Sequence, residues 1–203
     1  MKKLFLSALL GCTSLVATHA NANYFKDNFS WGYDSSVWTA RTGSNGTPFG
    51  CAFKTDLLNP SEHGLTLSLA QGSCSELQSN HFYGYGKVQG RLKSGNVAGT
   101  VSSIFTYTSW WDSPGRAWQE IDIELLPSLG NVVHTNVIYQ PQGGQYQSWE
   151  KDIDLSQYGL DYRENLLTIG FDWSSNAIRW YLFDANGHEQ TLVLKVKMLS
   201  LVD

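Results

Sequence analysis

The sequence has few charged residues and no long helical pattern. Charged side chains make up 16% of the chain and aromatic ones 13%, a composition that excludes a disordered chain and a coiled coil. The formal net charge of −4 argues against a nucleic-acid partner, because such proteins usually present a basic face. No phosphate loop, Ser-His-Asp arrangement or organic-cofactor motif is recognised. The four histidines that follow residue 22 lack the spacing of metal ligands; they are His63, His81, His134 and His188. We expect neither a cofactor nor a metal.

The N-terminus predicts an export signal. Two lysines open the chain, an apolar run follows, and residues 20–22 carry the Ala-x-Ala pattern of a cleavage site. We place cleavage after Ala22, so that residues 1–22 are the signal peptide and 23–203 are secreted or periplasmic. A membrane span is disfavoured because polar residues interrupt the apolar run. A lipid anchor on Cys12 is the alternative, because the residues before it loosely resemble a lipoprotein box.

Few cysteines remain after such a cleavage. Cys51 and Cys74 form an even number in a chain bound for an oxidising compartment, which predicts one disulfide. Two buried free thiols and half of a metal site are the alternatives, the second without a C-x-x-C motif to support it.

Short β-rich segments separated by turn residues predict an all-β protein. The segments with strand-like patterns include 64–69, 101–107, 132–139 and 166–171. Breaks rich in glycine, proline and asparagine occur at 43–48, 113–115, 141–144 and 184–187. No internal repeat or linker interrupts the mature chain. We therefore expect one domain, 23–203, folded as an antiparallel β-sandwich.

Three carboxylates alternate with apolar residues in the segment 118–125. In a strand, residues two apart point the same way, so Glu120, Asp122 and Glu124 share one face while the residues between them face the core. A retaining glycoside hydrolase needs two carboxyls about 5 to 5.5 Å apart, which inward-leaning glutamates can reach. Crowding of like charges predicts a raised pKa for at least one carboxyl, which could then protonate a departing sugar. The alternatives are a solvated strand face and a calcium site, although calcium sites usually use loops.

Motifs on both sides of these carboxylates follow one another in a specific order. They are Asn45-Gly46, Phe82–Gly86, Val101–Thr108, Glu120–Glu124, Gly170–Trp173 and Ile178–Tyr181. Together with the two cysteines, they resemble the bacterial lichenases of glycoside hydrolase family 16, over residues 25–181. The resemblance implies a concanavalin-like jelly roll that binds a β-glucan polysaccharide. We expect it to be a monomer.

The resemblance also implies roles for individual residues. Glu120 would be the nucleophile and Glu124 the general acid/base, with Asp122 hydrogen-bonded between them. The unbroken spacing of the three acids favours mixed-linkage 1,3-1,4-β-glucan, because laminarinases usually insert a residue before the last glutamate. Aromatic faces and polar groups would hold the sugars. The residues implied in substrate binding are Trp118, Phe105, Tyr107, Asn45, Glu76 and Asn136.

Departures from the family pattern concern the substrate sites and the C-terminus. Gly43, Gln78 and Ile138 stand where the family has Tyr, Arg and Tyr. Other β-glucans, xyloglucan and transglycosylation are therefore alternatives. After Tyr181 the similarity fades, and residues 192–203 lack the family's final motifs, so we expect the last C-terminal strands to be missing. A carbohydrate-binding sandwich with impaired activity is the alternative function.

Overall fold

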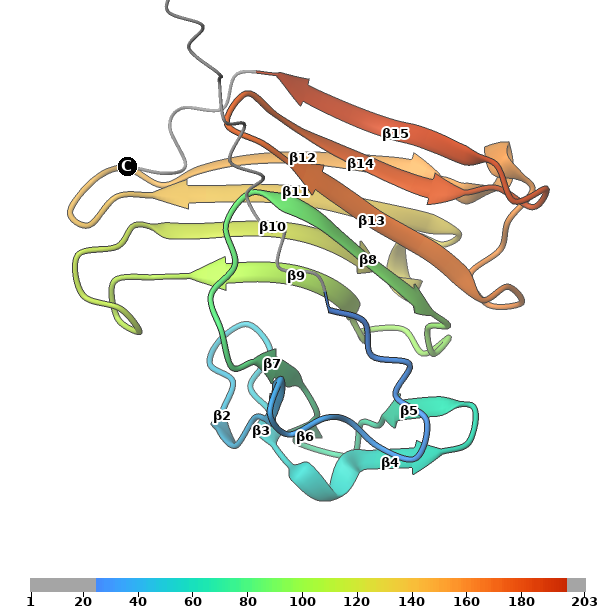
Figure 1. The fold of residues 1–203 in the computed structure, drawn as a ribbon, viewed down its shortest axis with the longest axis horizontal. Helices are drawn as coiled ribbons and strands as arrows, with labels where there is room; N and C mark the ends of the chain where they lie inside the picture. The colour runs from blue at the N-terminus through green and yellow to red at the C-terminus, as the bar shows by residue number, and fades with distance from the viewer. Residues whose placement is uncertain (1–24, 197–203) are drawn as a thin grey trace, which may run out of the picture. The chain divides into compact units, whose positions relative to one another are not determined.

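The computed structural model describes residues 25–196, which form two compact units (Figure 1). The described part of the first unit is 25–82, and that of the second is 83–196. The predicted signal peptide, Cys12 and the last seven positions, 197–203, lie outside the described residues. The expectation of a single domain over the mature chain stays a prediction.

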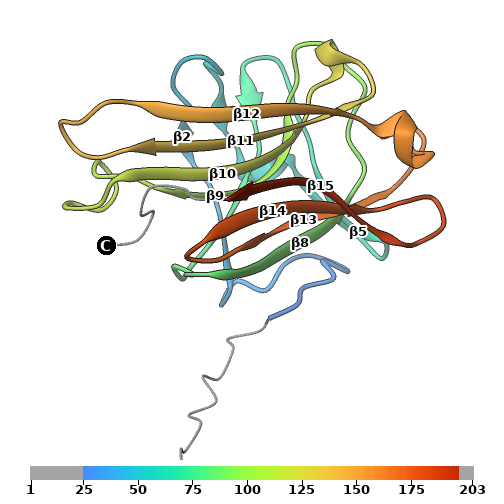
Figure 2. The same ribbon diagram turned by 90° about the horizontal axis from the view of Figure 1, so that it is seen from above.

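The second unit is a sandwich of two antiparallel four-stranded sheets. One sheet has the order β12-β11-β10-β9, and the other has the order β15-β14-β13-β8. Figure 2 shows them as two layers. The predicted antiparallel β-sandwich is therefore confirmed. Its elements are β8 (Gly86–Leu92), β9 (Ser102–Thr108), β10 (Trp118–Leu125), η2 (Pro127–Leu129), β11 (Val132–Gln140), β12 (Gln147–Asp154), η3 (Leu155–Tyr158), β13 (Leu167–Trp173), β14 (Ala177–Phe183) and β15 (Glu189–Val196).

The core of this unit lies between the two sheets. Strand β10 contributes Ile121, Ile123 and Leu125, which are at most 2% exposed and pack in one cluster with side chains of β13 and β14. Burying each such aliphatic side chain stabilises the fold by about 1.5 to 3 kcal/mol. From the other sheet, the Trp180 indole donates a hydrogen bond to the Asp122 backbone carbonyl at 3.0 Å. Strand β10, which carries the three acids, is therefore held in place by packing and by a hydrogen bond on its core side.

Residues 25–82, the described part of the first unit, consist of short strands and one 3-10 turn. The elements are β1 (Trp38–Ala40), β2 (Gly43–Ser44), β3 (Ala52–Phe53), η1 (Thr55–Leu57), β4 (Leu58–Ser61), β5 (Gly64–Leu67), β6 (Ser73–Cys74) and β7 (Leu77–Ser79). Strand β2 lies inside the break predicted at 43–48, because its two residues pair with β3. That part of the prediction was wrong.

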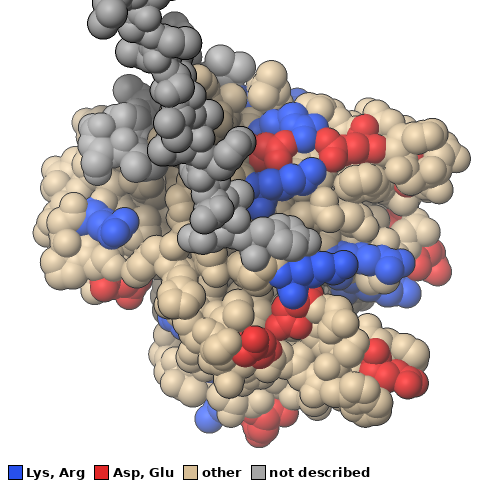
Figure 3. Space-filling view, viewed as in Figure 1, with Lys and Arg blue, Asp and Glu red and all other residues tan. Residues whose placement is uncertain are grey.

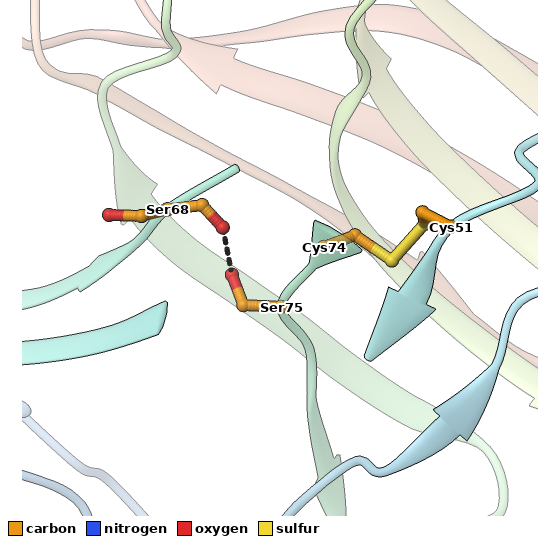
Figure 4. The surroundings of a disulfide bond; sticks show 4 residues. All are labelled: Cys51, Ser68, Cys74 and Ser75. Carbon is orange, nitrogen blue, oxygen red and sulfur yellow. Dashed lines mark hydrogen bonds between the residues drawn. A yellow bond between two sulfur atoms is a disulfide. The ribbon is translucent and has the colours of Figure 1, made fainter. Parts of the chain in front are cut away.

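A disulfide joins Cys51 to Cys74 in the first unit, with the two Cα atoms 5.8 Å apart. Figure 4 shows it beside β6, where the Ser75 hydroxyl donates to the Ser68 carbonyl at 2.8 Å. The predicted pairing of the two cysteines is confirmed.

The surface reflects the low charge content of the chain. Figure 3 shows a mostly uncharged face on which basic and acidic side chains are interspersed. On β8, β14 and β15 these charges pair, since Lys87 and Arg179 both contact Glu189. Among the described residues, no helix is long and apolar enough to cross a membrane.

Candidate active site

Three carboxylates lie in a row on the face of β10 that points away from the core. Strand β10 is an inner strand, paired with β9 on one side and β11 on the other. Because side chains alternate along a strand, burying Ile121 and Ile123 turns Glu120, Asp122 and Glu124 to the opposite face. The structure therefore brings together the three residues that the spacing singled out.

Strand register decides which side chains flank each carboxylate. The neighbours on β9 and β11 are Tyr107 and Ile138 for Glu120, Phe105 and Asn136 for Asp122, and Ser103 and His134 for Glu124. Directly opposite positions in antiparallel strands have Cβ atoms about 4.5 to 5.5 Å apart. Four predicted substrate-binding residues thus share the sheet face with the acids: Trp118, Phe105, Tyr107 and Asn136.

Asp122 is the most buried of the three acids, at 5% exposure. Burial raises its pKa to about 9, with further contributions from the charges of Glu120 and Glu124 and from a hydrogen bond to Glu120. At neutral pH the Asp122 carboxyl therefore holds a proton, which it can share with Glu120. This arrangement lets three adjacent acids coexist without three full negative charges.

Burial also raises the pKa of Glu124. Two neighbours modify this shift, since His134 lowers the pKa and Glu150 raises it. The His134 Nδ1 atom lies 2.6 Å from Asp152 Oδ1, so the imidazole is held in place beside the glutamate. A carboxyl with a raised pKa retains its proton closer to neutral pH and can act as a general acid.

His134 is a site residue that sequence reasoning missed, because the histidines were considered only as metal ligands. The pairing of 118–125 with 132–140 in a hairpin would have placed His134 opposite Glu124. Within residues 25–196, no group of three His, Cys, Asp or Glu side chains is arranged to hold a metal ion.

Trp118 fixes the other end of the carboxylate row. Its indole nitrogen donates a hydrogen bond to Glu120 Oε2 at 2.9 Å. Its ring also contacts Trp111 and Tyr146, with centroid separations of 5.5 Å in both cases. Trp111 and Tyr146 were not singled out from the sequence, because each lies in a turn without a motif.

Asn136 has a buried polar atom whose hydrogen-bonding capacity is unused. It lies opposite Asp122, and its side-chain Oδ1 is buried without a hydrogen-bond partner in the structure. A buried unpaired carbonyl oxygen costs about 1 to 3 kcal/mol, which a bound hydroxyl group could recover.

Asn45 and Glu76 belong to the unit 25–82, so the geometry of β9, β10 and β11 does not include them. Glu76 lies 3.8 Å from Arg41; burial raises the pKa of this glutamate, and Arg41 lowers it. Arg41 also donates to Gln78 at 2.9 Å. The predicted sugar contacts of Asn45 and Glu76 stay predictions.

Glutamates on either side of an aspartate with a raised pKa, with aromatic rings beside them on one face of a β-sandwich, have the chemistry that a glycoside hydrolase needs. A model of the glycosyl hydrolases family 16 matches residues 45–193. The chain belongs to this family.

Curated relatives and a solved structure agree with this assignment. The chain is 34% identical over 195 residues to a beta-glucanase of Bacillus amyloliquefaciens, covering 93% of this chain and 77% of the relative. It is 33% identical over 190 residues to a beta-glucanase of Paenibacillus polymyxa, covering 88% of this chain and 76% of the relative. The Bacillus licheniformis beta-glucanase structure superposes with a TM-score of 0.69 at 30% identity, covering 85% of this chain and 77% of that one. The fold is thus the jelly roll that the resemblance implied.

Proposed function

We propose that this protein is a secreted endo-β-glucanase that hydrolyses mixed-linkage 1,3-1,4-β-glucan with retention of configuration. The observation that carries the proposal is the row of three acids on β10, in which a protonated Asp122 separates Glu120 from Glu124. The names of the relatives support a β-glucan substrate.

In the first step, Glu120 attacks the anomeric carbon of the sugar at the cleavage point. The bond from that carbon to the bridging oxygen breaks, and Glu124 gives its proton to the departing oxygen. The products are a glycosyl ester on Glu120 and a free sugar hydroxyl. The raised pKa of Glu124 supports its assignment as the proton donor.

In the second step, the ionised Glu124 takes a proton from water while the water oxygen attacks the same carbon. The ester bond breaks, and Glu120 leaves as a carboxylate. Two successive inversions give net retention.

Asp122 and Trp118 would act on Glu120 throughout. Both contribute hydrogen bonds to the Glu120 carboxylate, which orient it toward the anomeric carbon. When the ester breaks, the same bonds stabilise the charge that returns to Glu120, which favours release of the product.

Mixed-linkage specificity is supported by the regularity of β10. Its pairing with β11 runs without a register shift from Trp118 to Leu125, so no bulge separates the last glutamate from the other acids. Secretion is supported by the disulfide and by the signal-like residues 1–22.

The decisive experiment uses azide as a replacement nucleophile. With an aryl β-glycoside of a glucan oligosaccharide, Glu124→Ala should form the glycosyl ester and then stall, and azide should release a β-glycosyl azide. Azide rescue of Glu120→Ala should instead yield the α-product by a single inversion. The reverse pairing of products would refute the roles assigned to these residues.

Substrate specificity is tested by reducing-sugar release from barley β-glucan, lichenan, laminarin and xyloglucan. Barley β-glucan and lichenan should be cleaved best. Binding of these polymers without cleavage would instead identify a carbohydrate-binding protein.

A further inference from the structure

An exposed aromatic row lies next to the carboxylates and extends well beyond Trp118. Trp111 is 54% exposed and Tyr146 is 50% exposed. Each ring contacts Trp118, and Trp110 continues the row with its centroid 4.6 Å from that of Trp111. The contacts are T-shaped or tilted rather than stacked, so the rings do not cover one another's faces completely.

This aromatic row crosses the strands of the sheet. Trp111 comes from the turn between β9 and β10, Trp118 from β10 itself, and Tyr146 from the turn between β11 and β12. Figure 1 shows both turns at the same end of the sheet, where they extend from neighbouring hairpins.

A bound glucan chain must cross the strands in the same direction. The nucleophile and the proton donor act from opposite sides of the bond that breaks. Glu120 and Glu124 both lie on β10, so the sugar chain passes between them, across the strand. Its two arms then extend toward β9 and toward β12, alongside the aromatic row.

Both turns are held by internal hydrogen bonds. In the first, Ser109 Oγ donates to Asp112 at 2.9 Å, and the Ser113 amide donates to the Ser109 carbonyl at 2.8 Å. In the second, the Gly144 amide donates to the Pro141 carbonyl at 2.8 Å. Side chains already held in position lose little conformational freedom when a ligand binds.

We propose that Trp111 and Tyr146 form two additional sugar-binding subsites on opposite sides of the scissile bond, each taking the apolar face of a β-linked glucosyl unit. This inference rests on the proposed function. A β-linked glucosyl ring presents C–H groups on its faces and hydroxyl groups around its edge, so an aromatic ring can cover the face while the hydroxyls stay in water. The aromatic row continues directly from Trp118, which is hydrogen-bonded to Glu120, so the occupant is the substrate chain itself.

The test compares two substrates. Barley β-glucan fills subsites on both sides of the scissile bond, whereas a 4-nitrophenyl glycoside of a glucan trisaccharide fills sugar subsites on one side only. Trp111→Ala and Tyr146→Ala should each lower kcat/KM on the polymer by about tenfold. On the aryl glycoside, only one of them should do so. Trp111→Phe and Tyr146→Phe should restore most of the polymer activity, because an aromatic face is kept.

Leu129→Ala is the matched control, because this exposed apolar side chain lies in η2, in the turn between β10 and β11 at the opposite end of the sheet. Its kcat/KM should equal that of wild type on both substrates. Unchanged polymer activity in either alanine variant with a wild-type melting temperature would overturn the inference. Equal losses for both variants on both substrates would also overturn it.

A binding measurement separates failure of this inference from failure of the proposed function. If the wild-type protein cleaves no β-glucan, the proposed function is wrong. The migration of the wild-type protein in native gels that contain barley β-glucan still tests the two subsites. Retardation of wild type that weakens in Trp111→Ala and in Tyr146→Ala supports them, and equal migration of all three proteins refutes them.

Discussion

Replacing Asp122 by Asn should make the protein more stable, and the gain should grow with pH. The folded carboxyl has a pKa of about 9, raised by burial and by the neighbouring glutamates, against an ordinary value of 3.8. Between these values the folded chain holds a proton at Asp122 that the unfolded chain has lost. The stability that this protonated group contributes is complete below pH 3.8 and is lost progressively as the pH rises toward 9.

The magnitude follows from proton linkage. One extra proton bound in the folded state lowers the free energy of unfolding by about 1.4 kcal/mol for each pH unit, or by about 4 kcal/mol between pH 5 and pH 8. The amide that replaces the carboxyl in Asp122→Asn would be neutral in both states and would keep a donor for Glu120. The difference in unfolding free energy between this variant and wild type should therefore widen by about 4 kcal/mol over this range.

Urea denaturation followed by tryptophan fluorescence at pH 5, 6, 7 and 8 measures this difference directly. Contributions of all other ionisable groups that the substitution leaves unchanged cancel in it. Asp56→Asn, at an exposed position, serves as the control for the same chemical change outside the carboxylate row, and the widening for Asp122→Asn is compared with it. A constant difference for Asp122→Asn would refute the assignment of a proton to this carboxyl at neutral pH.

Three further predictions concern the same fold. His134→Gln removes the neighbour that lowers the pKa of Glu124, so the alkaline limb of the kcat/KM profile should move to higher pH; an unmoved limb would separate this imidazole from the proton donor. Reducing the disulfide between Cys51 and Cys74, which are 23 residues apart, should lower the free energy of unfolding by about 3 to 4 kcal/mol and lower the Tm. Two free thiols in the isolated protein, found by thiol titration under denaturing conditions, would contradict this prediction. Trp118→Ala should lower kcat/KM more than Trp118→Phe, because the alanine variant loses both the hydrogen bond to Glu120 and the aromatic face. Equal kcat/KM values in wild type and both variants would show that this residue does not act in the site.

The alternation of apolar and acidic residues was enough to predict the carboxylate row. A strand has a period of two, so burial of Ile121 and Ile123 leaves only one face for the acids between them. The same local rule located the segments that became β9, β11 and β13. It failed at Gly43–Ser44, because two residues carry no periodic signal and their strand exists only through pairing with β3.

Side chains that meet across strands could not be predicted in this way. His134 lies opposite Glu124, and Trp111 and Tyr146 meet at Trp118, through the register and the turns of two hairpins. No spacing along the chain encodes those contacts. They arise only when residues from separate segments pair.

The sequence by itself determined that this protein is built of strands, that three acids share one strand face, and that two cysteines are available to pair. The tertiary structure decided the pKa values of those acids. Asp122 has a pKa of about 9 because the sandwich buries it between two glutamates, and Glu124 has its raised pKa because burial outweighs the effect of His134 on the next strand. Desolvation and cross-strand charge depend on what surrounds a group in space, and these surroundings are created only when the sheets form.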